Sequence, residues 1–206
     1  MYQAASSVAE EFIHDGEIVD TLAYARENRA NRPLIEAILQ KAAEGKGVSH
    51  REAAVLLECE LPDLNERMFE LARQIKQKFY GNRIVMFAPL YLSNYCINGC
   101  VYCPYHKKNK TIPRRKLTQD EIRREVTALQ DMGHKRLAIE AGEDPVNNPI
   151  EYILESIKTI YSVHHKNGSI RRVNVNIAAT TVENYRKLRD AGIGTYILFQ
   201  ETYNKA

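Results

Sequence analysis

The sequence of 206 residues has no hydrophobic run of membrane-spanning length, little net charge and few cysteines, and each shortage narrows the possible functions. Because the sequence has no apolar N-terminal run, we expect neither a signal peptide nor a membrane span, and we expect a cytoplasmic chain that binds no membrane. A net charge of +3 is too small to predict nucleic-acid binding by itself. Four cysteines in a cytoplasmic protein favour a metal site or catalysis over disulfides.

The N-terminal part of the chain is dominated by helical signals. Ser49 and Glu52 form a capping box ahead of an apolar helical pattern, and Asp63 with Glu66 repeats that signal before a second one. Residues 1–82 are therefore predicted to form an all-helical extension. No internal repeat or low-complexity tract interrupts it.

From residue 83 onward the sequence alternates between strand and helix patterns. A continuous apolar run at residues 84–90 predicts a buried parallel strand. Further strands are expected at 137–141, 173–178 and 196–199, and helices at about 118–132, 150–164 and 182–191. The first of these helices begins with a third predicted capping box, made by Thr118 and Glu121. This alternation predicts parallel β/α winding.

The predicted fold is α/β, a parallel β/α barrel of which residues 83–206 supply the first four β/α units. A complete eight-fold barrel takes about 250 residues. Only about 124 residues follow the helical extension, so we expect half a barrel and a fragment of a longer protein, with a small open α/β sheet as the alternative. Catalytic residues of such barrels lie in the loops after the strands. The cysteines follow the first predicted strand, Glu143 the second and Glu201 the fourth.

Three cysteines, Cys96, Cys100 and Cys103, form a C-x3-C-x2-C pattern within eight residues. Three thiolates can hold three corners of a cubane iron–sulfur cluster and leave the fourth iron free for a small molecule. The alternative is a zinc site completed by His106. Tyr102, just before the last cysteine, favours the cluster, because its ring can lie against a planar ligand.

This cysteine loop resembles the signature of the radical S-adenosylmethionine superfamily. The resemblance implies that the three cysteines bind a 4Fe-4S cluster, whose free iron takes the amino and carboxylate groups of S-adenosylmethionine. Reductive cleavage of the sulfonium would then give a 5′-deoxyadenosyl radical that abstracts hydrogen from the substrate.

Further positions resemble the superfamily one by one. The triplet Ala141-Gly142-Glu143 is similar to its Gly-Gly-Glu motif. The resemblance implies that Gly142 and Glu143 hold the ammonium of S-adenosylmethionine, where a carboxylate suits a cation. Glu201 matches the ribose-contacting position, and Tyr102 is expected to line the same cofactor. No side chain is assigned a catalytic role.

Longer runs resemble one family within this superfamily, the tyrosine lyases that mature FeFe-hydrogenases. The runs include NRIVMFAPLYLSNYC, MGHKRLAIEAGEDPVN and GIGTYILFQETY. The resemblance implies a carbon–carbon lyase that cleaves L-tyrosine to p-cresol and dehydroglycine. In this family a second, C-terminal cluster then helps to make carbon monoxide and cyanide for the hydrogenase H-cluster.

The resemblance also implies partners and competitors. The expected partners are an electron donor, such as a flavodoxin or ferredoxin, and the other hydrogenase maturases. No nucleic-acid partner is expected. Because the second cluster and the later strands lie beyond this sequence, we do not expect the chain to complete the reaction alone. The 2-iminoacetate synthases of thiamine biosynthesis are the nearest alternative, and a non-enzymatic metal-binding module is another.

Two remaining features are interpreted as structural. A basic run follows the cysteine loop and is expected to be solvated; its members are Lys107, Lys108, Lys110, Arg114, Arg115 and Lys116. Aromatic residues are not interleaved through it, which counts against RNA binding. Asn174 and Asn176 alternate along the third predicted strand and are candidates to point into the barrel, as cavity lining or as part of a hydrogen-bond network.

Overall fold

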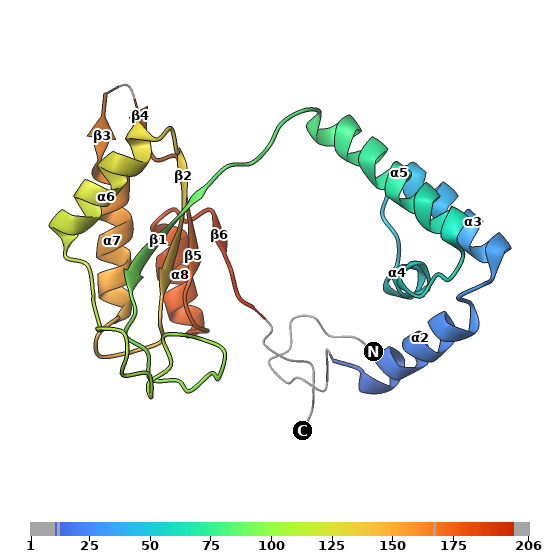
Figure 1. Ribbon diagram of the computed structural model, residues 1–206, viewed down its shortest axis with the longest axis horizontal. Coiled ribbons are helices and arrows are strands. Elements are labelled where there is room, and N and C mark those ends of the chain that lie inside the picture. Colours follow the sequence, from blue (N-terminus) through green and yellow to red (C-terminus); the bar gives the residue numbers. More distant parts are fainter. Residues whose placement is uncertain (1–10, 12, 167, 200–206) are drawn as a thin grey trace. The chain divides into compact units, whose positions relative to one another are not determined.

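The computed structural model describes residues 11, 13–166 and 168–199 (Figure 1). It divides into two compact units, Met1–Ile84 and Val85–Ala206, and each has a buried core of its own. Among the described residues, no helix is both long and apolar enough to cross a membrane.

The first unit is helical where the structure describes it. Its helices are α2 (Asp15–Glu27), α3 (Arg32–Ala43), α4 (His50–Leu57) and α5 (Pro62–Tyr80). Their buried side chains form one apolar cluster, made of Ala25, Ile35, Ile38, Leu39, Val55 and Leu64. Burial of this cluster holds the short helices together, because helices of this length are marginal in water on their own.

One of the two predicted capping boxes in this unit is confirmed and the other is wrong. Ser49 Oγ accepts from the Glu52 amide at 3.2 Å, and Glu52 Oε2 accepts from the Ser49 amide at 2.7 Å. At the second site α5 begins at Pro62, whose fixed φ suits the first helical position. Asp63 therefore lies inside the helix, and its carboxylate accepts two bonds from the Arg32 guanidinium, at 2.7 and 2.9 Å.

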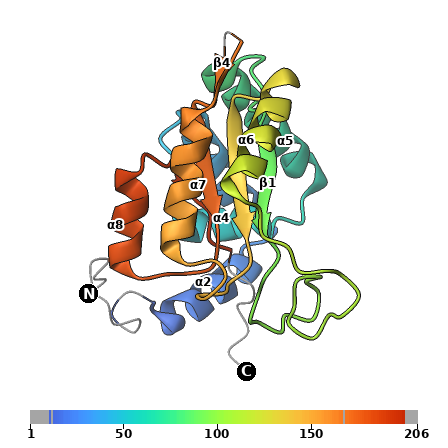
Figure 2. The same cartoon turned by 90° about the vertical axis from the view of Figure 1, so that its left-hand side faces the viewer.

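The second unit is a parallel sheet with intervening helices, which confirms the predicted β/α winding. The strands are β1 (Ala88–Ser93), β2 (Arg136–Ala141), β5 (Arg172–Asn176) and β6 (Thr195–Tyr196), in the order β1-β2-β5-β6. The connecting helices are α6 (Gln119–Asp131), α7 (Ile150–Ser162) and α8 (Val182–Asp190). Together these helices cover one face of the sheet (Figure 2).

Three local predictions for this unit have wrong bounds, one of them the last strand, which was predicted at 196–199 and forms only at Thr195–Tyr196. Residues 84–87 are more than half exposed and precede the strand, because β1 pairs with β2 only from Ala88, opposite Leu137. The helix predicted to reach residue 164 ends at Ser162, and a short antiparallel hairpin follows, with β3 (His164–His165) paired to β4 (Gly168–Ser169).

The two faces of the sheet have opposite chemistry. The face toward the helices is apolar and buried, with Leu90, Leu92, Leu137, Ile139, Val173 and Val175 in one cluster. On the other face Tyr91, Glu140 and Asn176 lie in one row across β1, β2 and β5, because Tyr91 pairs with Glu140 and Glu140 with Asn176. Side chains alternate between faces along a strand, so the apolar face is packed and the polar face is available for a ligand.

The start of α6 provides a test of local stability. Thr118 Oγ1 accepts from the Glu121 amide at 3.2 Å, and Glu121 Oε2 accepts from the Thr118 amide at 2.7 Å. We expect Thr118→Ala to destabilise this end of the helix by about 1 kcal/mol, measured by native-state hydrogen exchange of the α6 amides. Thr118→Ser keeps the hydroxyl and should stay near the parent value. Equal losses in the two variants would contradict the capping role.

Candidate functional site

The cysteine loop leaves the sheet at the end of β1 and is closed at its base by main-chain pairing (Figure 2). Ser93 and Lys116 form an antiparallel bridge. Beyond it, the Asn94 amide donates to Arg115 O at 3.1 Å, and Asn94 Nδ2 donates to Pro113 O at 2.9 Å. The cysteines therefore lie on a loop whose two ends are fixed side by side at the carboxyl edge of the sheet.

A second loop, after β2, contacts the cysteine loop directly. The Ile97 amide donates to Glu143 O at 2.8 Å, and Asn98 Nδ2 donates to Glu143 Oε2 at 2.5 Å. Asn148 Nδ2 bridges the two loops, donating to Tyr95 O at 3.0 Å and to Gly142 O at 2.8 Å. The structure thus brings Glu143 and the cysteine loop together, although more than forty residues separate them in the sequence.

Gly142 lies so close to the cysteine loop that no side chain fits there. A Cβ added at Gly142 would overlap Tyr95 O and would lie 2.8 Å from Cys96 Cβ. Real Cβ atoms do not approach other atoms this closely, so glycine is required by packing at this position. The glycine of the triplet therefore has a physical role that its sequence pattern alone does not reveal.

The three cysteines are free thiols with different exposure. Cys96 and Cys103 are half-buried and Cys100 is exposed, while the Cys103 amide donates to Cys100 O at 3.1 Å. Within the described residues, no three His, Cys, Asp or Glu side chains are grouped closely enough to hold a metal ion, with or without His106. The donor set itself fits an iron–sulfur cluster, because thiolates are the ligands of such clusters and all three belong to one loop closed at its base.

Of the two remaining residues predicted to contact the cofactor, the structure describes only Tyr102. The Tyr102 side chain is 70% exposed in the cysteine loop, where it is accessible to a ligand. Glu201 lies outside the described residues, so its proposed ribose contact stays a prediction.

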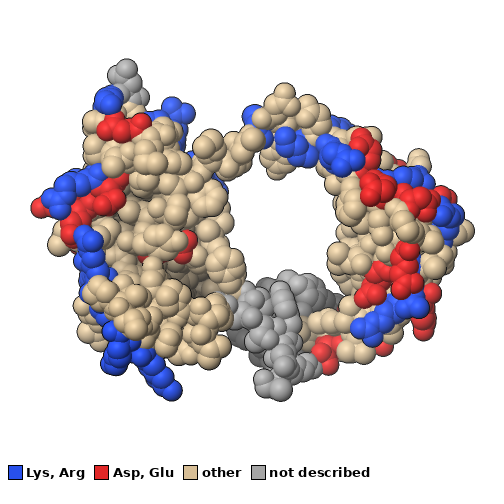
Figure 3. All heavy atoms as spheres, viewed as in Figure 1, with Lys and Arg blue, Asp and Glu red and all other residues tan. Residues whose placement is uncertain are grey.

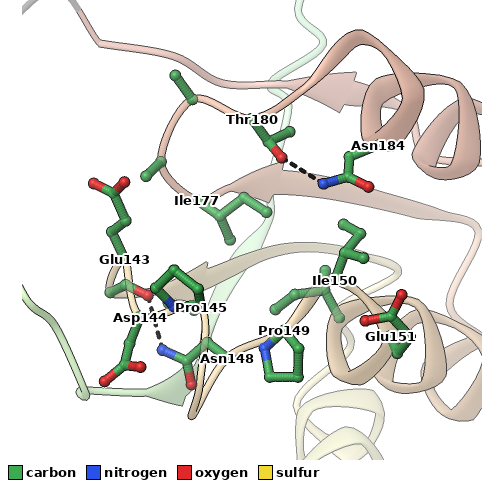
Figure 4. A pocket seen from close by; sticks show the side chains of 15 residues that line it. Glu143, Asp144, Pro145, Asn148, Pro149, Ile150, Glu151, Ile177, Thr180 and Asn184 are labelled. Carbon is green, nitrogen blue, oxygen red and sulfur yellow. Dashed lines mark hydrogen bonds between the residues drawn. The ribbon is translucent and has the colours of Figure 1, made fainter.

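A cavity of about 350 Å³ opens beside Glu143, between the carboxyl ends of β2 and β5 and the first turns of α7 and α8 (Figure 4). Its walls are largely apolar, and they include Pro145, Pro149, Ile150, Ile153 and Ile177. Thr180 and Asn184 supply polar groups, with Asn184 Nδ2 donating to Thr180 Oγ1 at 2.7 Å. A mostly apolar cavity with a few polar groups is the usual form of a small-molecule site.

Sequence reasoning missed the carboxylate of Glu140, which lies on the polar face of the sheet. Burial raises the pKa of Glu140, and a hydrogen bond from Asn176 Nδ2 to Oε2 at 2.5 Å partly offsets this. The pKa of Tyr105 is also raised, chiefly by burial and then by the nearby Tyr91, Cys103 and Glu140. The sequence signal for these polar positions was that Tyr91 and Glu140 each lie between apolar residues of their own strand, which places them on the opposite face.

The prediction of a solvated basic run is wrong for two of its members. Lys107, Lys108 and Lys110 are exposed, and Figure 3 shows basic side chains at the end of the unit where this loop lies. Arg114 and Lys116 are half-buried instead. Lys116 Nζ lies 4.0 Å from the centroid of the Tyr152 ring and donates to Asn147 O.

Comparison with known proteins gives both a family match and similar solved structures. The family model described as "Radical SAM superfamily" matches residues 90–206, more than half of the chain. A crystal structure of HydG, described as a maturase of the FeFe-hydrogenase, is 59% identical with a TM-score of 0.88, covering 93% of this chain and 42% of that one. HydG from Carboxydothermus hydrogenoformans is 39% identical with a TM-score of 0.80, covering 97% and 45%.

Curated relatives are more distant. The 2-iminoacetate synthase of Salmonella typhimurium is 28% identical over 170 residues, covering 82% of this chain and 43% of the relative. The FeFe-hydrogenase maturase subunit HydE of Thermotoga maritima is 31% identical over 140 residues, covering 68% and 38%. The chain therefore spans less than half the length of each of these proteins.

The contact at Gly142 is open to a direct test. We expect Gly142→Ala to displace Cys96 and to cost about 1–3 kcal/mol of unfolding free energy, the usual cost of overpacking, measured by hydrogen exchange of the β2 amides. Gly99→Ala is the matched control, because a Cβ at Gly99 meets nothing within 4 Å. Equal effects of the two substitutions would show that the close approach is unimportant.

The raised pKa of Glu140 predicts a pH dependence with a definite sign. The pKa of Glu140 is higher in the folded than in the unfolded state, where a glutamate has a pKa of about 4.5. Ionisation of this carboxyl therefore destabilises the fold as the pH rises above 4.5. Glu140→Gln should therefore become more stable relative to the parent between pH 4 and 7, as measured by urea unfolding. Glu125→Gln, at an exposed position on α6, is the control. A relative stability of Glu140→Gln that is constant over this range would refute the assignment.

Proposed function

The chain belongs to the radical S-adenosylmethionine superfamily, and from this we propose that Cys96, Cys100 and Cys103 hold a 4Fe-4S cluster that binds S-adenosylmethionine. Members of this superfamily use that cluster and that cofactor. The observation that carries the proposal is the set of three thiols on one closed loop, against which Gly142 and Glu143 pack. Three protein thiolates leave one iron open to a small molecule.

Each residue of the site then has a defined task. Gly142 lets the loop after β2 approach Cys96, and Glu143 joins the two loops through Ile97 and Asn98. Gly142 and Glu143 are assigned as contacts of the ammonium group of S-adenosylmethionine. Tyr102 and Glu201 are assigned as further contacts of the same cofactor. We place the cofactor or substrate in the adjacent cavity, whose walls are largely apolar. When bound, the cluster supplies an electron and S-adenosylmethionine supplies the radical that starts the reaction.

The reaction that we propose is cleavage of L-tyrosine by a lyase of the HydG type. The support is the 59% identity and TM-score of 0.88 to a HydG structure over 93% of this chain. In such an enzyme tyrosine gives p-cresol and dehydroglycine, and carbon monoxide and cyanide follow for the hydrogenase H-cluster. The alternative is a 2-iminoacetate synthase of thiamine biosynthesis, which the 28% identity to the Salmonella relative favours less strongly.

The proposed partners follow from the same reaction. A reductive cleavage needs an electron donor, and a flavodoxin or a ferredoxin has the required chemistry. Other hydrogenase maturases are the proposed protein partners that would receive the product. A cytoplasmic location stays a prediction.

Anaerobic reconstitution tests the cluster. We expect a brown protein with charge-transfer absorption and about four irons per chain, and a changed EPR spectrum when S-adenosylmethionine is added. The iron content and the charge-transfer absorption should be lost in Cys96→Ser, Cys100→Ser or Cys103→Ser, and both should be retained in His106→Ala. A colourless protein that binds zinc tightly and loses it in His106→Ala would instead indicate the closed zinc module.

The substrate is tested on a protein extended to the length of the HydG structures, because this chain spans less than half of them. With a reductant, S-adenosylmethionine and L-tyrosine, the extended protein should release 5′-deoxyadenosine and p-cresol, both measured by chromatography. Formation of 5′-deoxyadenosine without p-cresol by the extended protein would contradict tyrosine cleavage.

A further inference from the structure

The cysteine loop has no apolar core of its own. Every residue from Asn94 to Lys116 is exposed or half-buried, so none of the side chains that usually fix a backbone by burial is present. A segment of this length that buries so little must be ordered by polar contacts, because fixing each residue costs conformational entropy. The hydrogen bonds of the loop therefore decide its conformation.

One side chain makes an unusual share of these bonds. The guanidinium of Arg114 donates to four main-chain carbonyls: through Nη1 to Asn94 O at 2.6 Å and Tyr105 O at 2.8 Å, and through Nη2 to His106 O at 2.8 Å and Asn109 O at 3.4 Å. Among the salt bridges of the described residues, none involves Arg114, although its neighbour Arg115 pairs with Glu121. The cation is thus directed at the backbone of the loop.

The four acceptors lie on both sides of the cysteines. Asn94 precedes Cys96, whereas Tyr105 and His106 follow Cys103 by two and three residues. The guanidinium therefore ties the arm of the loop that leads to the first cysteine to the arm that leaves the last one. A planar fork can serve several acceptors in one fixed geometry, which the single ammonium of lysine cannot do.

We propose that Arg114 is the positioning residue of the cysteine loop: its guanidinium fixes both arms of the loop so that Cys96, Cys100 and Cys103 act as one ligand set. The inference rests on the proposed function in one respect only, namely that the ligand set binds an iron–sulfur cluster. The ordering of the loop by Arg114 does not depend on any metal.

The test compares three variants. Arg114→Lys keeps the charge and loses the fork, and Arg114→Gln loses both. Lys108→Gln is the matched control, because it removes one charge from an exposed position of the same loop. Hydrogen exchange in α6 and α7 reports whether the core of each variant is folded.

The first measurement uses metal-free protein. We expect amide exchange at Ile97 and Lys107, whose amides are hydrogen-bonded within the site, to rise at least fivefold in both Arg114 variants. Alkylation of the half-buried Cys96 and Cys103 should rise by a similar factor. Lys108→Gln should match the parent. Unchanged exchange and alkylation in Arg114→Lys and Arg114→Gln, with a folded core, would overturn the proposal.

The second measurement is the iron content after anaerobic reconstitution. Both Arg114 variants should retain less than half of the parent's iron, and Lys108→Gln should retain all of it. Parent-like iron content in both Arg114 variants would also overturn the positioning role. If the parent itself takes up no iron, the proposed function fails, and the metal-free measurement still decides the role of Arg114.

Discussion

The close approach of Gly142 to Cys96 is the contact on which the rest of the site depends. It exists because β1 and β2 are parallel neighbours, so the loops after them leave the same edge of the sheet. The missing side chain at Gly142 lets the backbones meet, and the hydrogen bonds of Glu143 to Ile97 and Asn98 then hold them together. Two loops that are distant in the sequence are thus joined by a close backbone approach together with side-chain hydrogen bonds.

The two faces of the sheet differ in their chemistry. Apolar side chains on one face pack against α6, α7 and α8, while the row formed by Tyr91, Glu140 and Asn176 leaves the other face polar. Burial raises the pKa of Glu140 because the carboxylate loses part of its hydration there. The buried apolar cluster on the other face supplies packing that offsets this cost.

Prediction from the sequence succeeded where the signal involves residues close together in the chain. It failed where the structure depends on a residue or strand that is distant in the sequence. The capping boxes at Ser49 and Thr118 are confirmed, because a cap involves residues three apart in the chain. Parallel β/α winding is confirmed for the same kind of reason, since it follows from alternating local patterns. The strand predicted at residues 84–90 is confirmed only from Ala88, because pairing with β2 starts there and residues 84–87 are more than half exposed. The cap predicted at Asp63 is wrong because Pro62 starts the helix and Arg32, thirty-one residues away, takes the carboxylate.

The sequence by itself determined the chemistry available to this protein: three soft thiols at fixed spacing, a Gly-Glu pair and a β/α framework to carry them. These are properties of residue type and local spacing, which need no knowledge of distant neighbours. Only the tertiary structure decided that Gly142 must be glycine, that Glu140 lies on the polar face, and that Arg114 is directed at the cysteine loop while its neighbours face solvent. Each of these depends on which segments pack side by side, and packing is a property of the folded chain as a whole.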